Sequence, residues 1–256
     1  MPDLAAQRSS VAAFVETTKP GITRLVTITS LVGFALAAFT VDWSPGRLAV
    51  ALIGCVIGTA LSASGANALN QWMERARDAD MPRTASRPLP AGELSPNTVL
   101  VGGSLLCVLG VGLLLAVNGP APAAVSLACV LSYLLIYTPL KPITVSSTLV
   151  GAIPGALPPM IGWSAANGGS FASLTEAGSL SLFTLMFVWQ LPHFLAIAWM
   201  YREDYAAGGY RVLPVVDRTG RATSVTILVT AALLLPATVW PAFAIDGLGW
   251  LTASVA

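Results

Sequence analysis

Residues 48–88 read LAVALIGCVIGTALSASGANALNQWMERARDADMPRTASRP and join an apolar run to a charged one without a break. The apolar part, residues 48–70, is about the length that crosses a hydrocarbon core of ~30 Å as an α-helix. If the helix continues, Asn70, Glu74 and Asp78 lie on one face and rise about 6 Å per step. The stretch therefore predicts a membrane-spanning helix with a row of three oxygen-bearing side chains at its end.

The rest of the chain repeats the apolar pattern. Of its 256 residues 55% are hydrophobic and 10% are charged, and the mean hydropathy is +0.75, which is typical of an integral membrane protein. Seven runs have the length of a spanning helix, at residues 22–40, 48–70, 98–117, 121–140, 145–163, 180–200 and 222–245. We predict one all-α domain over residues 1–256, a polytopic transmembrane helical bundle with an N-terminal tail at residues 1–18. An eighth run, residues 247–256, is too short to span, so we expect a chain that is cut short at its C-terminus.

The basic residues predict how the bundle is oriented. Of the 13 lysines and arginines, all except Arg47 fall on the same side of the predicted spans as the N-terminus. Because basic residues collect on the cytoplasmic side of a membrane, we expect the N-terminus and the charged loops to be cytoplasmic. The absence of a long leader rich in Arg and Ser before residue 20 favours a bacterial plasma (inner) membrane.

The row formed by Asn70, Glu74 and Asp78 is typical of a magnesium site. Mg²⁺ takes one or two carboxylates from a protein, keeps some waters and completes its octahedron with phosphate oxygens of the substrate. Arg83 and Arg87 follow in the sequence and suit a bidentate clamp on those phosphates. A charged loop beside a membrane helix is usually a solvated face, but carboxylates at the inner end of an apolar helix are costly. We therefore predict a metal–diphosphate site.

A second charged loop, residues 201–221, is expected at the same membrane face and carries Arg202 and Asp204. Helical bundles build metal sites from side chains on facing helices, so we predict that Asp204 joins the metal ligands from the opposing half. Lys141 lies on a short loop at this face as well. It is predicted to neutralise the diphosphate as a point charge, although an anchor on the cytoplasmic side is an equally good interpretation.

His193 is the only histidine in the chain and falls inside the sixth predicted span. An ionisable residue at membrane depth is costly and by default marks a function. We expect His193 to make an axial contact to a metal macrocycle or to relay protons near the acceptor substrate. The alternative is a neutral histidine that is hydrogen-bonded in the bundle. Upstream, the glycines and prolines of residues 151–159 break up the fifth span, which suits a helix that borders a cavity.

These motifs together resemble one family. The pattern Asn70-x-x-x-Glu74-x-x-x-Asp78 resembles the first acidic motif of the UbiA-type intramembrane prenyltransferases. Its continuation to Leu89 is similar to the heme O synthase branch of that family. Later segments agree in order, namely Tyr137-Thr138-Pro139-Leu140-Lys141, residues 155–163, residues 189–194, and Asp204-Tyr205 with Leu213-Pro214. The resemblance covers almost all of the chain from Lys19 onward.

The resemblance implies that the farnesyl group of farnesyl diphosphate is transferred to the vinyl group of heme b with addition of water, which gives heme O and diphosphate. Mg²⁺ is the implied cofactor, and heme b is a substrate. The implied catalytic residues are Asn70, Glu74, Asp78, Lys141 and Asp204, the metal ligands are Asn70, Glu74, Asp78 and Asp204, and the substrate-binding residues are Arg83, Arg87, Tyr137, His193 and Arg202. Family members have nine spans around an intramembrane cavity, so we expect this chain to lack the end of the eighth and all of the ninth.

Two local features depart from the family's pattern. Pro142 stands where a second basic residue usually follows the loop lysine, and the second acidic motif is reduced to Glu203-Asp204. The alternatives are the same chemistry on an aromatic quinone precursor or chlorophyllide, a membrane transporter, and a non-catalytic assembly scaffold. The charged residues gather at one face and not at the bilayer midplane, which disfavours a transporter. Expected partners besides the substrates are the lipid bilayer and heme A synthase or terminal oxidase assembly factors, and no feature suggests nucleic acid.

Overall fold

The chain folds into helices throughout the part that is described. The computed structural model describes residues 9–245, and within them every regular element is helical. Seven helical segments are long and apolar enough to cross a membrane. They are α2 (Pro20–Ala38), α3 (Pro45–Ala79), α4 (Pro96–Asn118), the segment Pro120–Leu140, the segment Ser147–Ala166, α9 (Ala177–Met200) and α12 (Arg221–Ala244). The predicted bundle of seven spans is confirmed, and the eighth apolar run, residues 247–256, lies outside the described residues.

Shorter elements complete or connect these spans. The segment Pro120–Leu140 consists of α5 (Pro120–Leu131), the π-helix η1 (Ser132–Tyr137) and α6 (Thr138–Leu140). The segment Ser147–Ala166 consists of α7 (Ser147–Ala156) and α8 (Pro158–Ala166). The connecting elements are α1 (Ser10–Thr17), the 3-10 helix η2 (Ala172–Thr175), α10 (Arg202–Ala207) and α11 (Leu213–Val216).

Prolines set the limits of several helices. α3, α4 and α5 each begin at a proline, whose missing N–H costs nothing in the first turn. α3 then runs unbroken through the predicted row of polar side chains and ends at Ala79, shortly before Pro82, since a helix rarely continues into a proline. Pro158 separates α7 from α8, so the predicted break in the fifth span is confirmed.

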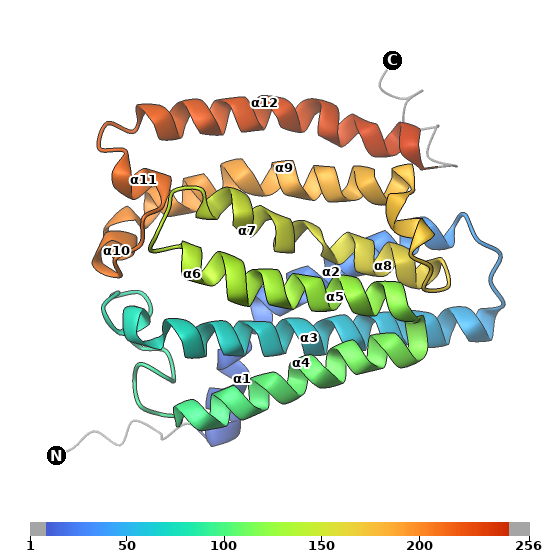
Figure 1. The fold of residues 1–256 in the computed structure, drawn as a ribbon, viewed down its shortest axis with the longest axis horizontal. Helices are drawn as coiled ribbons and strands as arrows, with labels where there is room; N and C mark the ends of the chain where they lie inside the picture. Colours follow the sequence, from blue (N-terminus) through green and yellow to red (C-terminus); the bar gives the residue numbers. More distant parts are fainter. Residues whose placement is uncertain (1–8, 246–256) are drawn as a thin grey trace.

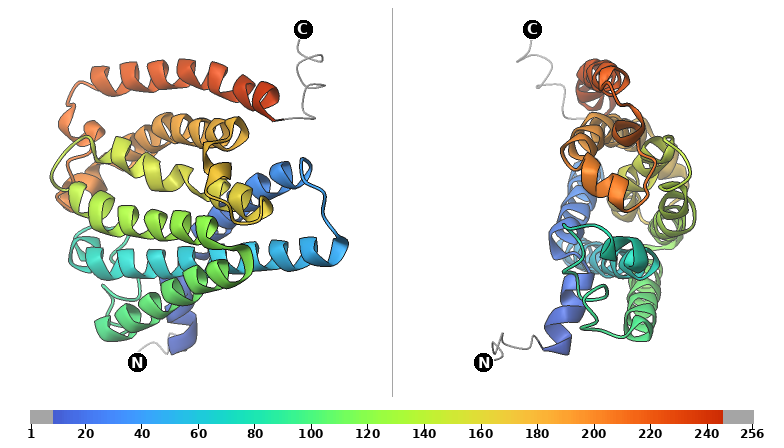
Figure 2. Two further views of the ribbon diagram at one scale, coloured as in Figure 1. Left: turned by 45° about the vertical axis from the view of Figure 1, so that its right-hand side comes forward. Right: turned by 90° about the vertical axis from the view of Figure 1, so that its left-hand side faces the viewer.

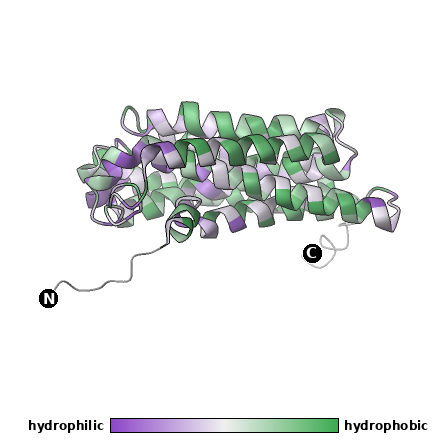
Figure 3. Cartoon of the chain, turned by 90° about the horizontal axis from the view of Figure 1, so that it is seen from below, coloured by the Kyte–Doolittle hydropathy of each residue, from purple (hydrophilic) through white to green (hydrophobic). Residues whose placement is uncertain are grey.

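The long helices form one bundle and run nearly side by side (Figures 1 and 2). α9 packs against α12 and α3 packs against α4, while α2 packs against α3 and α8. The C-terminal end of α3 lies at the same end of the bundle as α6, α10 and α11, on the left in Figure 1. Figure 3 shows that hydrophilic residues gather mainly at this end. We call it the polar end of the bundle.

The sides of the bundle are apolar. Val101, Leu228 and Leu235 are each more than half exposed, and many other large hydrophobic side chains on the spans are exposed as well. An apolar surface of this extent is expected where lipid, and not water, surrounds the protein. Together with the seven spans, it makes the chain an integral membrane protein.

Close packing of α2 on α8 depends on two glycines. A Cβ atom added at Gly162 in α8 would overlap the backbone of Ser30 in α2, and one added at Gly33 would overlap the backbone of Pro159. Small residues allow membrane helices to approach closely in this way.

Gly162→Ala is therefore expected to lower the thermal midpoint of the detergent-solubilised protein. The two helices must move apart, at a cost of about 1–3 kcal/mol. Gly112→Ala in α4 is the matched control, because a Cβ atom there would meet nothing within 4 Å. Equal midpoints for the two variants would show that the α2–α8 contact does not limit stability.

Candidate active site

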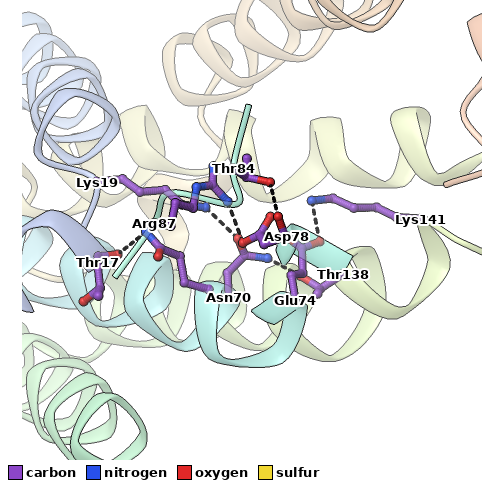
Figure 4. A network of polar contacts seen from close by, with 10 residues as sticks. Thr17, Lys19, Asn70, Glu74, Asp78, Thr84, Arg87, Thr138 and Lys141 are labelled. Atoms are coloured by element: carbon purple, nitrogen blue, oxygen red, sulfur yellow. Dashed lines mark hydrogen bonds and ion pairs between the residues drawn. The ribbon is translucent and has the colours of Figure 1, made fainter. Parts of the chain in front are cut away.

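The predicted row of polar side chains lies buried on one face of α3. Asn70, Glu74 and Asp78 are 0%, 6% and 1% exposed. They occupy successive turns because α3 continues without interruption to Ala79. We call these three residues the ladder. The apolar span thus ends in a buried set of oxygen-bearing side chains at the polar end of the bundle (Figure 4).

Each ladder residue contacts a different basic side chain (Figure 4). The three contacts, with the donor given first, are Lys19 Nζ to Asn70 Oδ1 at 2.7 Å, Lys141 Nζ to Glu74 Oε1 at 2.8 Å and Arg87 Nη1 to Asp78 Oδ2 at 2.7 Å. A buried carboxylate without such a partner would be strongly destabilising. The basic residues come from the α1–α2 link, the residue after α6 and the loop after α3. The ladder is therefore where three separate segments meet.

Lys19 belongs to this site although the sequence analysis gave it no role there. In the sequence, the only signal for Lys19 is its place before the first apolar run. In the structure its backbone φ is 49°, which is unusual for a residue with a side chain. Burial, with repulsion from Arg87, lowers the pKa of Lys19 to about 7. Burial also acts to lower the pKa of Lys141, but Tyr137 and Glu74 outweigh it and hold that pKa well above its usual value. The pKa values of the two lysines move in opposite directions because neighbouring groups outweigh burial at Lys141 and do not outweigh it at Lys19.

Thr138 joins the ladder to the irregular part of the fourth span. The Asn70 amide donates to Thr138 Oγ1 at 3.1 Å, and that hydroxyl donates to the carbonyl oxygen of Tyr133 at 2.8 Å. Tyr133 lies in the π-helix η1, a helix type often found at functional sites. The same segment places the ring of Tyr137 4.7 Å from the Lys141 ammonium. The predicted residue Tyr137 thus reaches the ladder through Lys141.

The predicted site residues of the second charged loop, Arg202 and Asp204, do not contact the ladder itself. Arg83 Nε lies 4.0 Å from Asp204 Oδ2, and the Arg83 guanidinium lies 4.9 Å from the centre of the Tyr201 ring. Arg202 is exposed and stacks over Trp199 at 4.8 Å. In the part of the chain that the structure describes, no three His, Cys, Asp or Glu side chains gather as a metal cluster. The structure therefore brings Arg83 and Asp204 together but joins neither Asp204 nor Arg202 to the ladder.

His193 is exposed on α9. Its ring stacks on Trp189 with the centroids 4.8 Å apart and is tilted against Phe194 at 5.9 Å. Both rings of the stack are partly open to the surroundings, because Trp189 is 43% exposed. The arrangement is an exposed pair of stacked rings and differs from a histidine enclosed in the bundle.

Two open pockets in the described part of the chain lie outside the ladder. A groove of about 340 Å³ runs along α2 and is lined at one end by Thr18 and Pro20, the neighbours of Lys19. A second pocket of about 400 Å³ lies around Trp43, at the opposite end of the bundle. Neither is lined by a ladder residue. Since basic side chains fill the space around the ladder, a bound anion must replace the contacts that they make with it.

Comparison with known proteins shows the family of the chain. Residues 26–256 match the UbiA prenyltransferase family, and the chain belongs to that family. The family predicted from the ladder motif is thereby confirmed. A protein from Opitutus terrae named protoheme IX farnesyltransferase is 40% identical over 94% of this chain and 78% of its own length. A second protein of that name, from Anaeromyxobacter sp., is 46% identical over 85% of this chain and 70% of its own length.

Solved structures of low identity share the fold. A UbiA homolog from Aeropyrum pernix K1 matches with a TM-score of 0.70 and 17% identity over 88% of this chain and 80% of that one. A UbiA homolog from Archaeoglobus fulgidus bound to DMAPP and Mg²⁺ matches with a TM-score of 0.65 and 16% identity, over 88% and 75% of the two chains. At these identities the likeness shows the fold alone.

Proposed function

We propose that this chain transfers the farnesyl group of farnesyl diphosphate to the vinyl group of heme b, with addition of water, to give heme O and diphosphate. The observation that carries the proposal is the ladder, whose two carboxylates and one amide are buried at the end of a membrane helix and each contact a basic side chain. Such a cluster suits a ligand with a phosphate head and an apolar tail. The relatives named protoheme IX farnesyltransferase support heme b as the acceptor.

The ladder fits a magnesium ion by the chemistry of its donors. All three offer oxygen atoms, and one or two protein carboxylates are enough when a diphosphate supplies further ligands. Asn70, Glu74 and Asp78 would hold the ion, and Asp204 would join them once it parts from Arg83. When bound, the ion supplies a Lewis acid and a template for the diphosphate. The UbiA homolog bound to DMAPP and Mg²⁺ supports a magnesium ion beside a prenyl diphosphate, and the ligands named here are our proposal.

The basic residues around the ladder bind the leaving diphosphate. Lys141, Arg83 and Arg87 neutralise it, and Lys19 adds a fourth donor. Negative charge builds on the bridging oxygen as the allylic C–O bond breaks, and donors that are held in place beforehand stabilise that charge preferentially in the transition state. Because three of them already contact the ladder, the diphosphate draws them from the ladder oxygens to its own.

The acceptor completes the reaction inside the bundle. The vinyl group of heme b supplies the electron pair of the new C–C bond, and water then adds to the resulting cation and releases a proton. The apolar interior holds the farnesyl tail and keeps bulk water from the allylic cation until that step. His193, stacked on Trp189, contacts the heme or its propionates, while Tyr137 and Arg202 contact the substrates.

The orientation of the chain follows from its charges. The ladder and nearly all basic residues share one membrane face, so the positive-inside rule places the N-terminus and the active-site loops in the cytoplasm, with the bundle in a bacterial inner membrane. Heme O leaves this site for terminal oxidases. Heme A synthase or oxidase assembly factors are therefore the protein partners to expect.

Turnover with and without metal tests the proposal. Membranes that contain the chain, supplied with heme b, farnesyl diphosphate and Mg²⁺, are expected to yield a heme heavier by one farnesyl group and one hydroxyl group. EDTA should abolish the product and added Mg²⁺ should restore it, because the metal is needed to template the diphosphate. Product masses from paired reactions provide the measurement.

Two outcomes of this assay contradict the proposal in different ways. Prenylation of an aromatic acceptor with no heme product would keep the diphosphate chemistry and replace the acceptor. Absence of prenyl transfer to any acceptor would reject a transferase.

A further inference from the structure

Tyr210 is a buried residue at the site to which no role has been assigned. It lies between α10 and α11 and is 3% exposed. Its N–H donates to the carbonyl oxygen of Tyr205 at 2.9 Å, and the next N–H, of Arg211, donates to the carbonyl oxygen of Lys141 at 2.9 Å. Gly209 precedes it with a φ of 68°, a conformation that favours glycine, so the turn that aims Tyr210 needs this residue. The backbone around Tyr210 is therefore fixed directly beside Lys141, the lysine that contacts Glu74 of the ladder.

The hydroxyl of Tyr210 is buried and has no hydrogen-bond partner within the described part of the chain. The Glu74 carboxylate lies close to this hydroxyl, but the two groups are not aligned as a good hydrogen bond. A tyrosine hydroxyl is protonated at neutral pH and is able to donate. A buried donor that is left unsatisfied is costly, so a ligand that accepts its proton would gain from binding there.

The surroundings of Tyr210 select an anionic partner. The Lys141 ammonium lies 5.6 Å from the centre of its ring, and the Arg77 guanidinium lies 5.8 Å from it. Arg77 is itself fixed by a hydrogen bond to the carbonyl oxygen of Gly208 at 3.0 Å. A donor hydroxyl flanked by two cations and a ladder carboxylate suits an oxygen of a metal-bound phosphate better than it suits a cation or an apolar group.

We propose that the Tyr210 hydroxyl donates a hydrogen bond to the diphosphate of the prenyl substrate, and that the α10–α11 turn supplies this contact from the second half of the bundle. The inference rests on the proposed function and adds a substrate-binding residue to it. Tyr210 contacts the diphosphate only, so its loss weakens prenyl diphosphate binding and leaves heme binding unchanged.

Tyr210→Phe tests this contact because it keeps the ring and removes only the hydroxyl. The probe is farnesyl S-thiolodiphosphate with Mg²⁺, whose C–S bond resists cleavage. Loss of one hydrogen bond to a charged acceptor is expected to weaken binding about tenfold. The thermal midpoint without ligand is expected to stay the same or to rise, because an unsatisfied buried hydroxyl has been removed. The KM for heme b should not change.

Ser179→Ala is the matched control. Ser179 is 0% exposed, and its hydroxyl is also buried without a partner, but it lies in the first turn of α9, about 30 Å along that helix from its end beside α10. It should bind the probe as the wild type does. Equal affinities of wild type and Tyr210→Phe would overturn the inference and leave the proposed function intact. A lower midpoint of Tyr210→Phe with unchanged affinity would make the hydroxyl structural, and a wild type that does not bind the probe would reject the proposed function as well.

Discussion

Asp78→Asn is expected to reduce the rate of heme farnesylation by about 100-fold or more at saturating substrates. The side chain keeps its shape, but the substitution removes the charge that holds Arg87 and that, in the proposed function, holds the metal. Arg87 Nη1 lies 2.7 Å from Asp78 Oδ2, so the substitution also frees the guanidinium from its position. Product formation per folded protein, measured with Mg²⁺ in excess, checks the expected loss.

Asp80→Asn is the control for this variant. Asp80 is exposed and follows the last residue of α3 by one position, so it shares the sequence neighbourhood and not the buried face. Its rate should stay near that of the wild type. The thermal midpoint of both variants must be measured, because breaking a buried ion pair costs up to about 3–5 kcal/mol. The Arg87 side chain is 23% exposed, and water therefore reduces this cost. Equal rates for the two variants would remove Asp78 from the chemistry.

Lys141→Gln is expected to lower both turnover and stability. The ammonium contacts Glu74 Oε1 at 2.8 Å and lies 4.7 Å from the centre of the Tyr137 ring, so its loss leaves a buried carboxylate unpaired. The rate should fall about 100-fold or more, because a preorganised charge at the leaving diphosphate is removed. Rates per folded protein and thermal midpoints are the measurements.

The double variant Lys141→Gln/Glu74→Gln separates the two effects. Two amides can hydrogen-bond to each other, so the thermal midpoint should recover much of what Lys141→Gln alone loses. Activity should not recover, because both the cation and the carboxylate proposed to bind the metal are gone. A double variant that regains turnover would show that this pair acts only in folding.

Features within one helix could be predicted from the sequence. The seven spans follow from apolar length, and the shared face of Asn70, Glu74 and Asp78 follows from the 3.6-residue period once the helix continues. The sequence analysis ended the second span at residue 70, whereas α3 reaches Ala79. Because α3 extends to Ala79, all three ladder residues lie within one helix, and the predicted shared face is confirmed.

Contacts between segments could not be predicted, because helical periodicity does not say which helices pack together. Lys19 stands 51 residues before Asn70 and reaches it only through the packing of α1, α2 and α3. The position of Tyr210 depends on a turn with a positive φ at Gly209. The residues next to Tyr210 in the sequence give no sign that its side chain lies near Glu74. Asp204 shows the converse, and its role as a metal ligand stays a prediction. Its charge and its loop suggested the ladder, but its ion-pair partner in the structure is Arg83.

The measurement that we would make first is a structure of the protein with farnesyl S-thiolodiphosphate and Mn²⁺ in place of Mg²⁺, with the metal located by anomalous scattering. We expect a metal peak within about 2.0–2.3 Å of oxygens of Glu74 and Asp78, with Lys19, Lys141 and Arg87 turned from the ladder toward the diphosphate. A metal and diphosphate bound elsewhere, with the three ladder contacts still in place, would contradict the proposed site.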